Sequence, residues 1–188
     1  PAAAPASDDA WTNLGLEGGT VNSIAIDPFT PTTLYAGTFG GVYKSTDAGA
    51  TWAFSGRGLV VRLRGDFSGF ASVNALVADP QLPDTVYAAT YDNIYSSTDA
   101  GASWGVFRGA GLPDVFQVED LVVVGDGATR VFYAAASDGV YSSVDGGASW
   151  LKGSGLPNQT WFDVTATSTN PRVAYVLGGY SLGDLYRT

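Results

Sequence analysis

Three aspartates stand in near-copies of one short stretch, which reads KSTDAGATW at 44–52, SSTDAGASW at 96–104 and SSVDGGASW at 142–150. Each copy follows the pattern Ser-x-Asp-x-Gly-x-Ser/Thr-Trp, and its carboxylate belongs to Asp47, Asp99 or Asp145. An acidic side chain beside hydroxyl side chains is suited to three tasks, which are calcium ligation, carboxylate catalysis and the stapling of a turn.

The spacing favours the turn over the calcium site and the catalytic site. An Asp side chain accepts hydrogen bonds from N–H groups further along a turn, and Gly adopts a positive φ at little cost. The Trp can begin the next strand and pack its ring on the sheet. We therefore interpret these positions as structural: Ser45, Asp47, Gly49, Trp52, Ser97, Asp99, Gly101, Trp104, Ser143, Asp145, Gly147 and Trp150.

The three stretches belong to longer repeats of about 50 residues. VNSIAIDP at 21–28 matches VNALVADP at 73–80, and looser copies stand at 118–126 and 164–171. A Tyr followed by small residues comes next each time, at Tyr35, Tyr87, Tyr133 and Tyr175. This pattern indicates four short strands per repeat, with the third and fourth joined by the acidic turn. The expected fold is all-β, a β-propeller of four-stranded antiparallel blades with about four blades in this chain.

The domain boundaries follow from the same repeats. Residues 1–7, PAAAPAS, are typical of a flexible spacer after a cleaved export signal, and residues 8–188 form the propeller. The fourth repeat reaches DLYRT at 184–188 without an acidic turn, so residues 8–16 with Trp11 are expected to complete the last blade. We expect closure within the chain, or a continuation lost by trimming, in preference to exchange between chains as in an eight-bladed dimer.

These motifs resemble the Asp-box (BNR) repeat family of β-propellers. That family includes bacterial sialidases, xyloglucan-degrading hydrolases, sortilin-type receptors and a photosystem II assembly factor. The resemblance covers nearly the whole chain after residue 8, and it implies that the acidic turns are structural and lie away from the ligand face. It does not fix a function, because members of the family range from enzymes to scaffolds.

Composition excludes several classes of site. The chain has no Cys and no His, so disulfides, thiolate metal sites and His-based catalytic triads are excluded. The formal net charge of −9 disfavours binding to nucleic acid. No apolar run is long enough to cross a membrane as a helix, and no metal or cofactor is expected.

The signals for catalysis are weak. Sialidases of the family carry a Phe/Tyr-Arg-Ile-Pro segment, and the nearest string here, VFRGAG at 106–111, lacks the Ile-Pro. Glu119 stands beside Asp120 in a first-strand position. The two could form a buried carboxylate pair, as glycoside hydrolysis requires two carboxylates, but we expect one of them to face a blade edge instead. We nevertheless name no catalytic residue, and we favour a binding role over an enzyme.

The candidate binding surface is the face that carries the links from strand two to three and from strand four to the next blade. The longest insertion there, SGRGLVVRLRGDFSGFAS at 55–72, interleaves Arg with aromatic residues, which dominate interface hot spots. Its alternative interpretation is a solvated β-hairpin extension. The candidate partner-binding residues are Arg57, Arg62, Arg64, Phe67, Phe70, Tyr91, Phe116, Trp161 and Tyr180, and Phe39, Asp92 and Asp114 are expected on the same face.

The resulting hypothesis is a non-catalytic bacterial module, secreted, periplasmic or at the cell surface, for protein or glycan recognition or assembly. NQT at 158–160 fits a glycosylation acceptor, although the pattern is short and common. Two alternatives stay open, which are a sialidase-like or glucan-active glycoside hydrolase fragment and a structural subunit of a cell-surface assembly.

Overall fold

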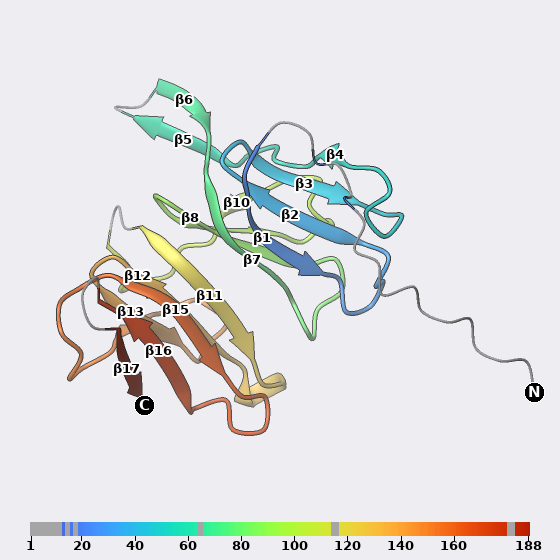
Figure 1. Ribbon diagram of the computed structural model, residues 1–188. Helices are drawn as coiled ribbons and strands as arrows, with labels where there is room; N and C mark the ends of the chain where they lie inside the picture. Colours follow the sequence, from blue (N-terminus) through green and yellow to red (C-terminus); the bar gives the residue numbers. More distant parts are fainter. Residues whose placement is uncertain (1–12, 14–15, 17–18, 64–65, 114–116, 180–182) are drawn as a thin grey trace, which may run out of the picture.

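The computed structural model describes residues 13, 16, 19–63, 66–113, 117–179 and 183–188. Their strands form four antiparallel sheets, one after another along the chain, and a separate two-stranded hairpin (Figure 1). No helix within these ranges is long and apolar enough to cross a membrane. The all-β expectation is therefore confirmed.

Each sheet is one blade. The first blade contains β1 (Val21–Ile26), β2 (Leu34–Thr38), β3 (Gly41–Ser45) and β4 (Ala53–Phe54). The second contains β7 (Val73–Ala78), β8 (Val86–Thr90), β9 (Ile94–Ser97) and β10 (Gly105–Val106). The third contains β11 (Val118–Val124), β12 (Val131–Ala136), β13 (Gly139–Ser143) and β14 (Leu151–Lys152). The fourth contains β15 (Trp161–Ala166), β16 (Ala174–Gly178) and β17 (Asp184–Arg187).

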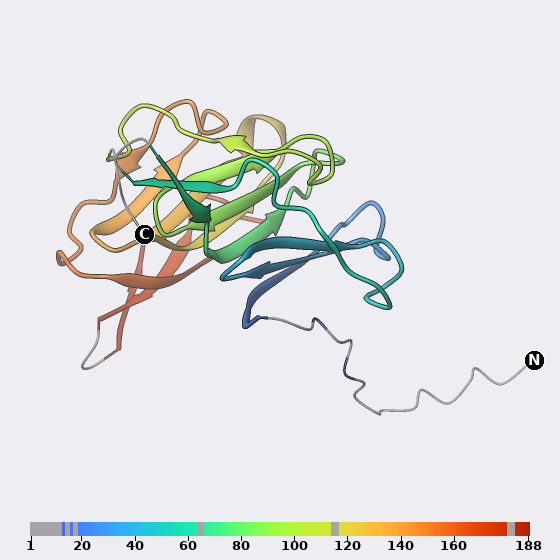
Figure 2. The same cartoon turned by 90° about the horizontal axis from the view of Figure 1, so that it is seen from above.

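The blades are arranged as in a β-propeller. Within each blade the strands follow one another in chain order, and the first strands β1, β7, β11 and β15 lie in sequence across the middle of the molecule (Figures 1 and 2). The hairpin of β5 (Val60–Leu63) and β6 (Asp66–Phe70) is inserted between the first and second blades and extends from one end of them. A short 3-10 helix, η1 (Gly127–Thr129), joins β11 to β12.

The fourth blade has three strands among the described residues. The N-terminal segment 8–16, which the sequence predicts as its outer strand, falls almost entirely outside the described residues. Its pairing with the strand that ends at Arg187 therefore remains a prediction.

Small residues in the second strand of each blade allow neighbouring blades to approach closely. The pairs Ala88–Ala89 and Ala134–Ala135 are completely buried. At the equivalent place in β2, a Cβ added to Gly37 would lie 2.7 Å from Cγ1 of Val73 in the next blade. Blade packing therefore explains why the sequence keeps Gly or Ala in these strands.

Each apolar core cluster lies between two consecutive blades. The cluster between the first and second blades contains Tyr35 and Val42 from one and Val73 and Leu76 from the other. The clusters between the second and third blades and between the third and fourth blades have the same plan. The described part of the chain is thus held together junction by junction.

Hydrogen bonds along the first strands reinforce these junctions. Nδ2 of Asn22 donates to the carbonyl oxygen of Val73 at 3.0 Å, and Nδ2 of Asn74 donates to that of Val118 at 2.8 Å. Because these amides lie one repeat apart, the bonds show that the strands meet in the same register at successive junctions.

Candidate functional site

The first acidic turn, residues 45–52, satisfies its carboxylate internally. Oδ1 of Asp47 accepts hydrogen bonds from Oγ of Ser45 and from N–H of Thr51, both at 2.8 Å. Oδ2 accepts a third from Oγ1 of Thr51 at 2.6 Å. Oγ of Ser45 in turn accepts the N–H of Gly49 at 2.8 Å. The aspartate joins the two ends of the turn, as an Asx-type staple does.

The second and third acidic turns, residues 97–104 and 143–150, repeat these contacts. Oδ1 of Asp99 accepts the N–H of Ser103 at 2.9 Å, and Oδ1 of Asp145 accepts that of Ser149 at 2.9 Å. Hydrogen bonds, above all from the Thr or Ser hydroxyl four residues later, lower the pKa of all three carboxyls to about 2. Within the described ranges, no group of acidic, His or Cys side chains could hold a metal ion.

The Trp that ends each of the second and third turns packs into the preceding blade. Trp104 shares a buried cluster with Tyr35, Val42 and Leu59, and its Nε1 donates to the carbonyl oxygen of Ser55 at 2.6 Å. Each such Trp therefore fills a socket made by its own blade and the blade before it.

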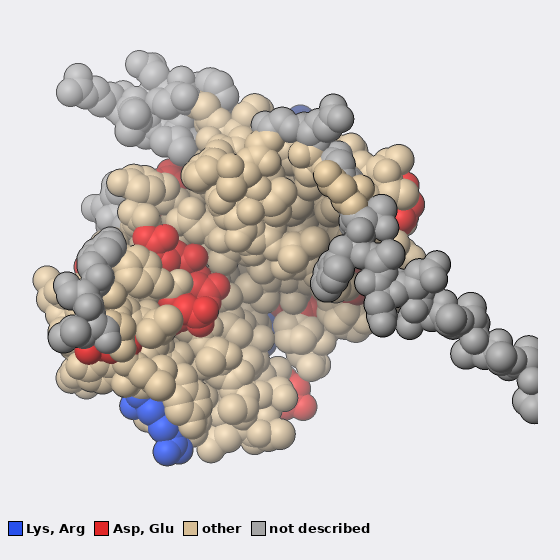
Figure 3. All heavy atoms as spheres, in the orientation of Figure 1, with Lys and Arg blue, Asp and Glu red and all other residues tan. Residues whose placement is uncertain are grey.

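The carboxylates of Glu119 and Asp120 lie at the start of β11, where acidic atoms gather in Figure 3. Oδ2 of Asp120 accepts the backbone N–H of Val164 in the fourth blade at 3.0 Å. Glu119 accepts a short hydrogen bond from Gln117 and a longer one, 3.4 Å, from Nδ2 of Asn74. Burial raises the pKa of both carboxyls. Asp120 is thus part of a blade junction, whereas Glu119 belongs to a polar cluster on the first strands.

Two exposed aromatic side chains occupy equivalent places in neighbouring blades. Phe39 lies between β2 and β3, Tyr91 lies between β8 and β9, and each is 62% exposed. The β5–β6 hairpin extends from the same end of the blades (Figure 1), and its Phe70 is 44% exposed. We call the surface formed by Phe39, Phe70 and Tyr91 the turn face.

Of the other candidate binding residues, Arg57 is exposed and its carbonyl oxygen accepts the N–H of Trp104 at 2.9 Å. Asp92 accepts a hydrogen bond from Oγ1 of Thr90 at 2.8 Å. Arg62 and Phe67 belong to the strands of the hairpin. The positions outside the described residues are Arg64, Asp114, Phe116 and Tyr180.

Trp161 is not available to a partner, which corrects its assignment to the binding face. Its side chain is completely buried, and its ring centroid lies 5.4 Å from that of Tyr186. As the first residue of β15 it points at the third blade, so it belongs to the core between blades.

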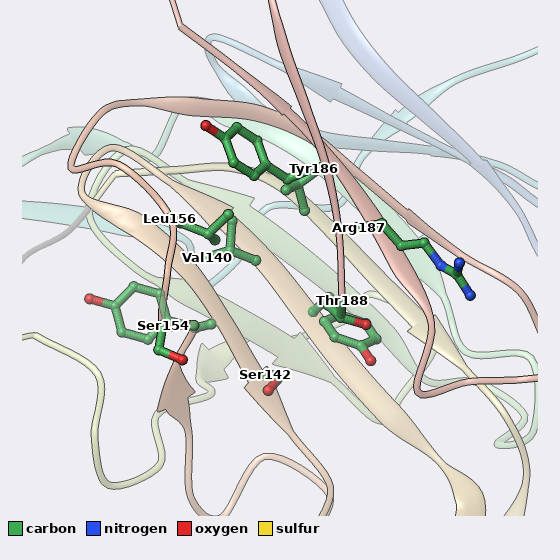
Figure 4. Close-up of a pocket in the computed structure, with 11 residues that line it drawn as sticks. Val140, Ser142, Ser154, Leu156, Tyr186, Arg187 and Thr188 are labelled. Atoms are coloured by element: carbon green, nitrogen blue, oxygen red, sulfur yellow. The ribbon is translucent and has the colours of Figure 1, made fainter.

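A cavity of about 340 Å³ opens between the outer parts of the third and fourth blades. Figure 4 shows Val140 and Leu156 on one side of it, and Tyr186, Arg187 and Thr188 on the strand that passes on the other side. Its lining is mainly apolar, with hydroxyls from Ser142 and Ser154 at one end, and no motif in the sequence had indicated it.

Sequence reasoning also missed a buried polar contact. Arg130, just before β12, donates hydrogen bonds to Asp79 and Tyr87 in the second blade. The Arg recurs at the equivalent Arg172 of the fourth repeat but is replaced by Asp84 in the second, so the repeats do not mark the ion pair as a shared feature.

No protein-family model matches the chain, and no curated protein matches it. Among solved structures, a GH74 xyloglucanase from Xanthomonas campestris matches at 20% identity and a TM-score of 0.68, over 90% of this chain and 28% of the enzyme. The extracellular domain of the hybrid two-component system BT3049 from B. thetaiotaomicron matches at 13% identity and a TM-score of 0.61, over 87% of this chain and 23% of that one.

A YCF48 protein solved with bound D1 peptide is 14% identical, with a TM-score of 0.56 over 93% of this chain and 53% of that chain. This chain therefore spans about a quarter of the GH74 enzyme and about half of YCF48. At these identities the likenesses show the fold, and the chain is a β-propeller structure of about four blades.

Proposed function

We propose that this chain is a non-catalytic propeller module of the Asp-box (BNR) repeat type that recognises a protein or glycan partner outside the cytoplasm. The observation that carries the proposal is the turn face, where Phe39 and Tyr91 expose large aromatic side chains at equivalent places in adjacent blades. Aromatic side chains are enriched at recognition surfaces because they bury much apolar area with few rotatable bonds.

The turn face is separated from the acidic turns, which lie at the other end of the blades (Figure 1). Since the acidic turns use their carboxylates internally, the end that carries the turn face and the β5–β6 hairpin is the better candidate for a partner. In the sequence, the same insertion also contains Arg57, Arg62, Arg64 and Phe67, which remain proposed partner-binding residues. The peptide bound to YCF48 and the extracellular location of BT3049 support recognition outside the cytoplasm as the role.

The experiment compares the parent with Phe39→Ser/Tyr91→Ser on a glycan array and against a displayed peptide library. The matched control is Phe29→Ser, because Phe29 is 49% exposed but lies in the β1–β2 link at the opposite end. We expect the double variant to lose at least about tenfold in affinity for any glycan or peptide selected with the parent, and the control to bind unchanged. Equal losses in both variants would contradict the assignment of the turn face.

A glycoside hydrolase is the second candidate function, favoured by the structural likeness to GH74 enzymes. Glu119 also favours it, because burial raises the pKa of its carboxyl, and a general acid requires a raised pKa. The neighbouring Asp120 is bonded to the N–H of Val164, so it is not placed to act as the second carboxylate. We expect no turnover of chromogenic glycosides or of xyloglucan. Turnover by the parent that Glu119→Gln abolishes would establish the hydrolase and overturn the non-catalytic assignment.

A further inference from the structure

The sequence contains an Asp-Gly step at three places, which are Asp126-Gly127, Asp138-Gly139 and Asp145-Gly146. The backbone can rearrange at such a step, because glycine has no Cβ to shield its nitrogen from the side chain of the preceding aspartate. That nitrogen can attack the carboxyl carbon of the aspartate and close a ring. In a folded chain the rate of this attack depends on how firmly the carboxyl and the glycine are held, and the three steps differ in this respect.

The carboxyl of Asp145 is held by the third acidic turn. Its Oδ1 accepts hydrogen bonds from Oγ of Ser143 at 2.8 Å and from the N–H of Ser149 at 2.9 Å, and its Oδ2 accepts one from Oγ of Ser149. These bonds, above all the one from the Ser149 hydroxyl, lower the pKa of Asp145 to about 2. The attack expels a carboxyl oxygen as water and therefore needs the protonated carboxyl, which is scarce at neutral pH. The step at Asp145 is thus protected.

The carboxyl of Asp138 is held by a cation and a phenol. Its Oδ2 accepts hydrogen bonds from Nζ of Lys152 at 2.9 Å and from the hydroxyl of Tyr141 at 2.8 Å. Burial opposes ionisation here, but the bonds to the ionised form outweigh it and lower the pKa of Asp138. Gly139 is the first residue of β13 and pairs with Ala136 of β12, so the nitrogen that would attack is fixed in the sheet. This step is protected as well.

The carboxyl of Asp126 is held the least. It accepts a hydrogen bond from Oγ1 of Thr129 at 2.9 Å, and no cation pairs with it among the described residues. Residues 126–129 are all exposed, and they form the link that contains η1, the short coiled segment after β11 in Figure 1. Solvent therefore reaches the whole step.

The backbone around Asp126 also has room to turn. Gly127 is the first residue of η1, where an N–H group has no partner inside the helix. A Cβ added to Gly127 would meet nothing within 4 Å, and the residue on the other side of Asp126 is Gly125. The attack requires the ψ angle of Asp126 to rotate from 153°, and a glycine on either side permits that rotation.

We propose that Asp126-Gly127 is a site of spontaneous isoaspartate formation, and that this modification loosens the junction between the second and third blades. The nitrogen of Gly127 forms a bond to Cγ of Asp126, and the bond from Cγ to the carboxyl OH group breaks. This OH group leaves as water with the amide proton of Gly127, which solvent carries. Water then opens the resulting succinimide. Opening at the main-chain carbonyl gives isoaspartate, whereas opening at the side-chain carbonyl restores aspartate.

The modification changes the residues that lead into β12. In the unmodified chain the main-chain oxygen of Asp126 accepts the N–H of Thr129 and the hydroxyl of Thr129, both at 2.8 Å. In isoaspartate that oxygen belongs to a free carboxylate, and the main chain gains an extra atom because it runs through the former side chain. Arg130 follows Thr129 directly and forms an ion pair with the buried Asp79 of the second blade. A link that no longer holds Arg130 in place should weaken this ion pair.

The experiment incubates the folded chain near neutral pH, below its melting temperature, in water labelled with heavy oxygen. Each succinimide that opens takes up labelled oxygen, and peptide mass spectrometry with chromatography locates the label and the isoaspartate. We expect isoaspartate to form at Asp126 at least about tenfold faster than at Asp138 or Asp145. The same chain unfolded in urea is the control, and there the three steps should react at rates within about threefold of one another, because no structure protects any of them.

A second measurement tests the effect on the junction. Asp126→Glu keeps the charge, but its longer side chain closes the ring far more slowly. The melting temperature of the parent should fall as isoaspartate accumulates, whereas that of Asp126→Glu should stay constant under the same incubation. Asp79→Asn/Arg130→Met should form isoaspartate as the parent does but lose less of its melting temperature, because it has no ion pair to weaken.

Two sets of results would overturn the proposal. Equal rates at the three steps of the folded chain, or a faster rate at Asp138 or Asp145, would overturn the assignment of the site. A parent rich in isoaspartate at Asp126 with an unchanged melting temperature, or an equal fall in the double variant, would overturn the effect on the junction.

Discussion

The guanidinium of Arg130 and the carboxylate of Asp79 form a buried ion pair that joins the third blade to the second. The side chain of Asp79 is fully buried and that of Arg130 is 15% exposed. The hydroxyl of Tyr87 donates to Oδ2 of Asp79 at 3.0 Å, and the guanidinium carbon of Arg130 lies 4.9 Å from the ring centroid of Phe132.

Breaking this pair should therefore be costly. We predict that Arg130→Ala lowers the free energy of unfolding by roughly 2–4 kcal/mol, because it leaves a buried carboxylate without its cation. The double variant Asp79→Asn/Arg130→Met keeps the side-chain oxygen that accepts the N–H groups of Gln81 and Leu82, and it removes both charges. It should therefore lose less unfolding free energy than Arg130→Ala. Urea denaturation measures the three proteins. A double variant as unstable as the single one would show that the charges are not coupled.

The acidic turns predict a defined dependence of stability on pH. Asp99→Ala should lower the free energy of unfolding at pH 7 by roughly 1–2 kcal/mol, reduced from the buried case because the turn is exposed. The pKa of Asp99 is about 2 in the folded chain and about 4 when unfolded, so its contribution is present above about pH 4. It should disappear as the pH falls from about 4 to 2, and melting curves of parent and variant should converge there. A difference in melting temperature between parent and Asp99→Ala that stays constant down to about pH 2 would contradict this assignment.

The backbone of the second acidic turn contains a removable strain. Ala100 has a φ of 55°, which is unfavourable for a residue with a Cβ, and the third turn has Gly146 with a φ of 74° at the equivalent place. We predict that Ala100→Gly stabilises the chain by about 0.5–1 kcal/mol. Ala102→Gly, in the same turn but without a positive φ, serves as the control and should be neutral or destabilising. Thermal unfolding in which Ala102→Gly is more stable than Ala100→Gly would show that Ala100 is not strained.

Asp120 should tolerate the loss of its charge but not of its oxygen. Asp120→Asn keeps an acceptor for the N–H of Val164, whereas Asp120→Leu leaves that N–H without it. Burial raises the pKa of Asp120 in the folded chain, so ionisation destabilises the parent once the pH exceeds the unfolded value of about 4. The melting temperature of Asp120→Asn should equal or exceed that of the parent at pH 7, and the advantage should shrink toward about pH 4. A stable Asp120→Leu variant would show that this hydrogen bond contributes little.

The repeated features of the sequence were sufficient to predict the fold. Tyr35, Tyr87 and Tyr133 with their small neighbours recur because they pack one blade against the next, and Trp104 and Trp150 after the second and third acidic turns pack in the same clusters. The prediction failed at Trp161 because a large aromatic replaces the Val of other first strands. That exchange is compensated by Gly178, where an added Cβ would lie 2.6 Å from the Trp161 ring.

The polar contacts between blades could not be predicted from the sequence, for a different reason. Arg130 and Asp79 are separated by a whole repeat. The equivalent position holds Arg172 in the fourth repeat but Asp84 in the second, so the repeats do not mark the pair. The cavity was missed because it is formed by residues such as Val140 and Leu156, which read as ordinary apolar core.

The division of the apolar core into one cluster per junction has a consequence for how the chain opens. Among the described residues, β8 and β12 belong to blades with a neighbour on each side, whereas β2 and β16 belong to blades with one neighbour. The local openings that expose amide hydrogens of β2 and β16 should therefore need less free energy than those of β8 and β12, so these amides should exchange faster with solvent.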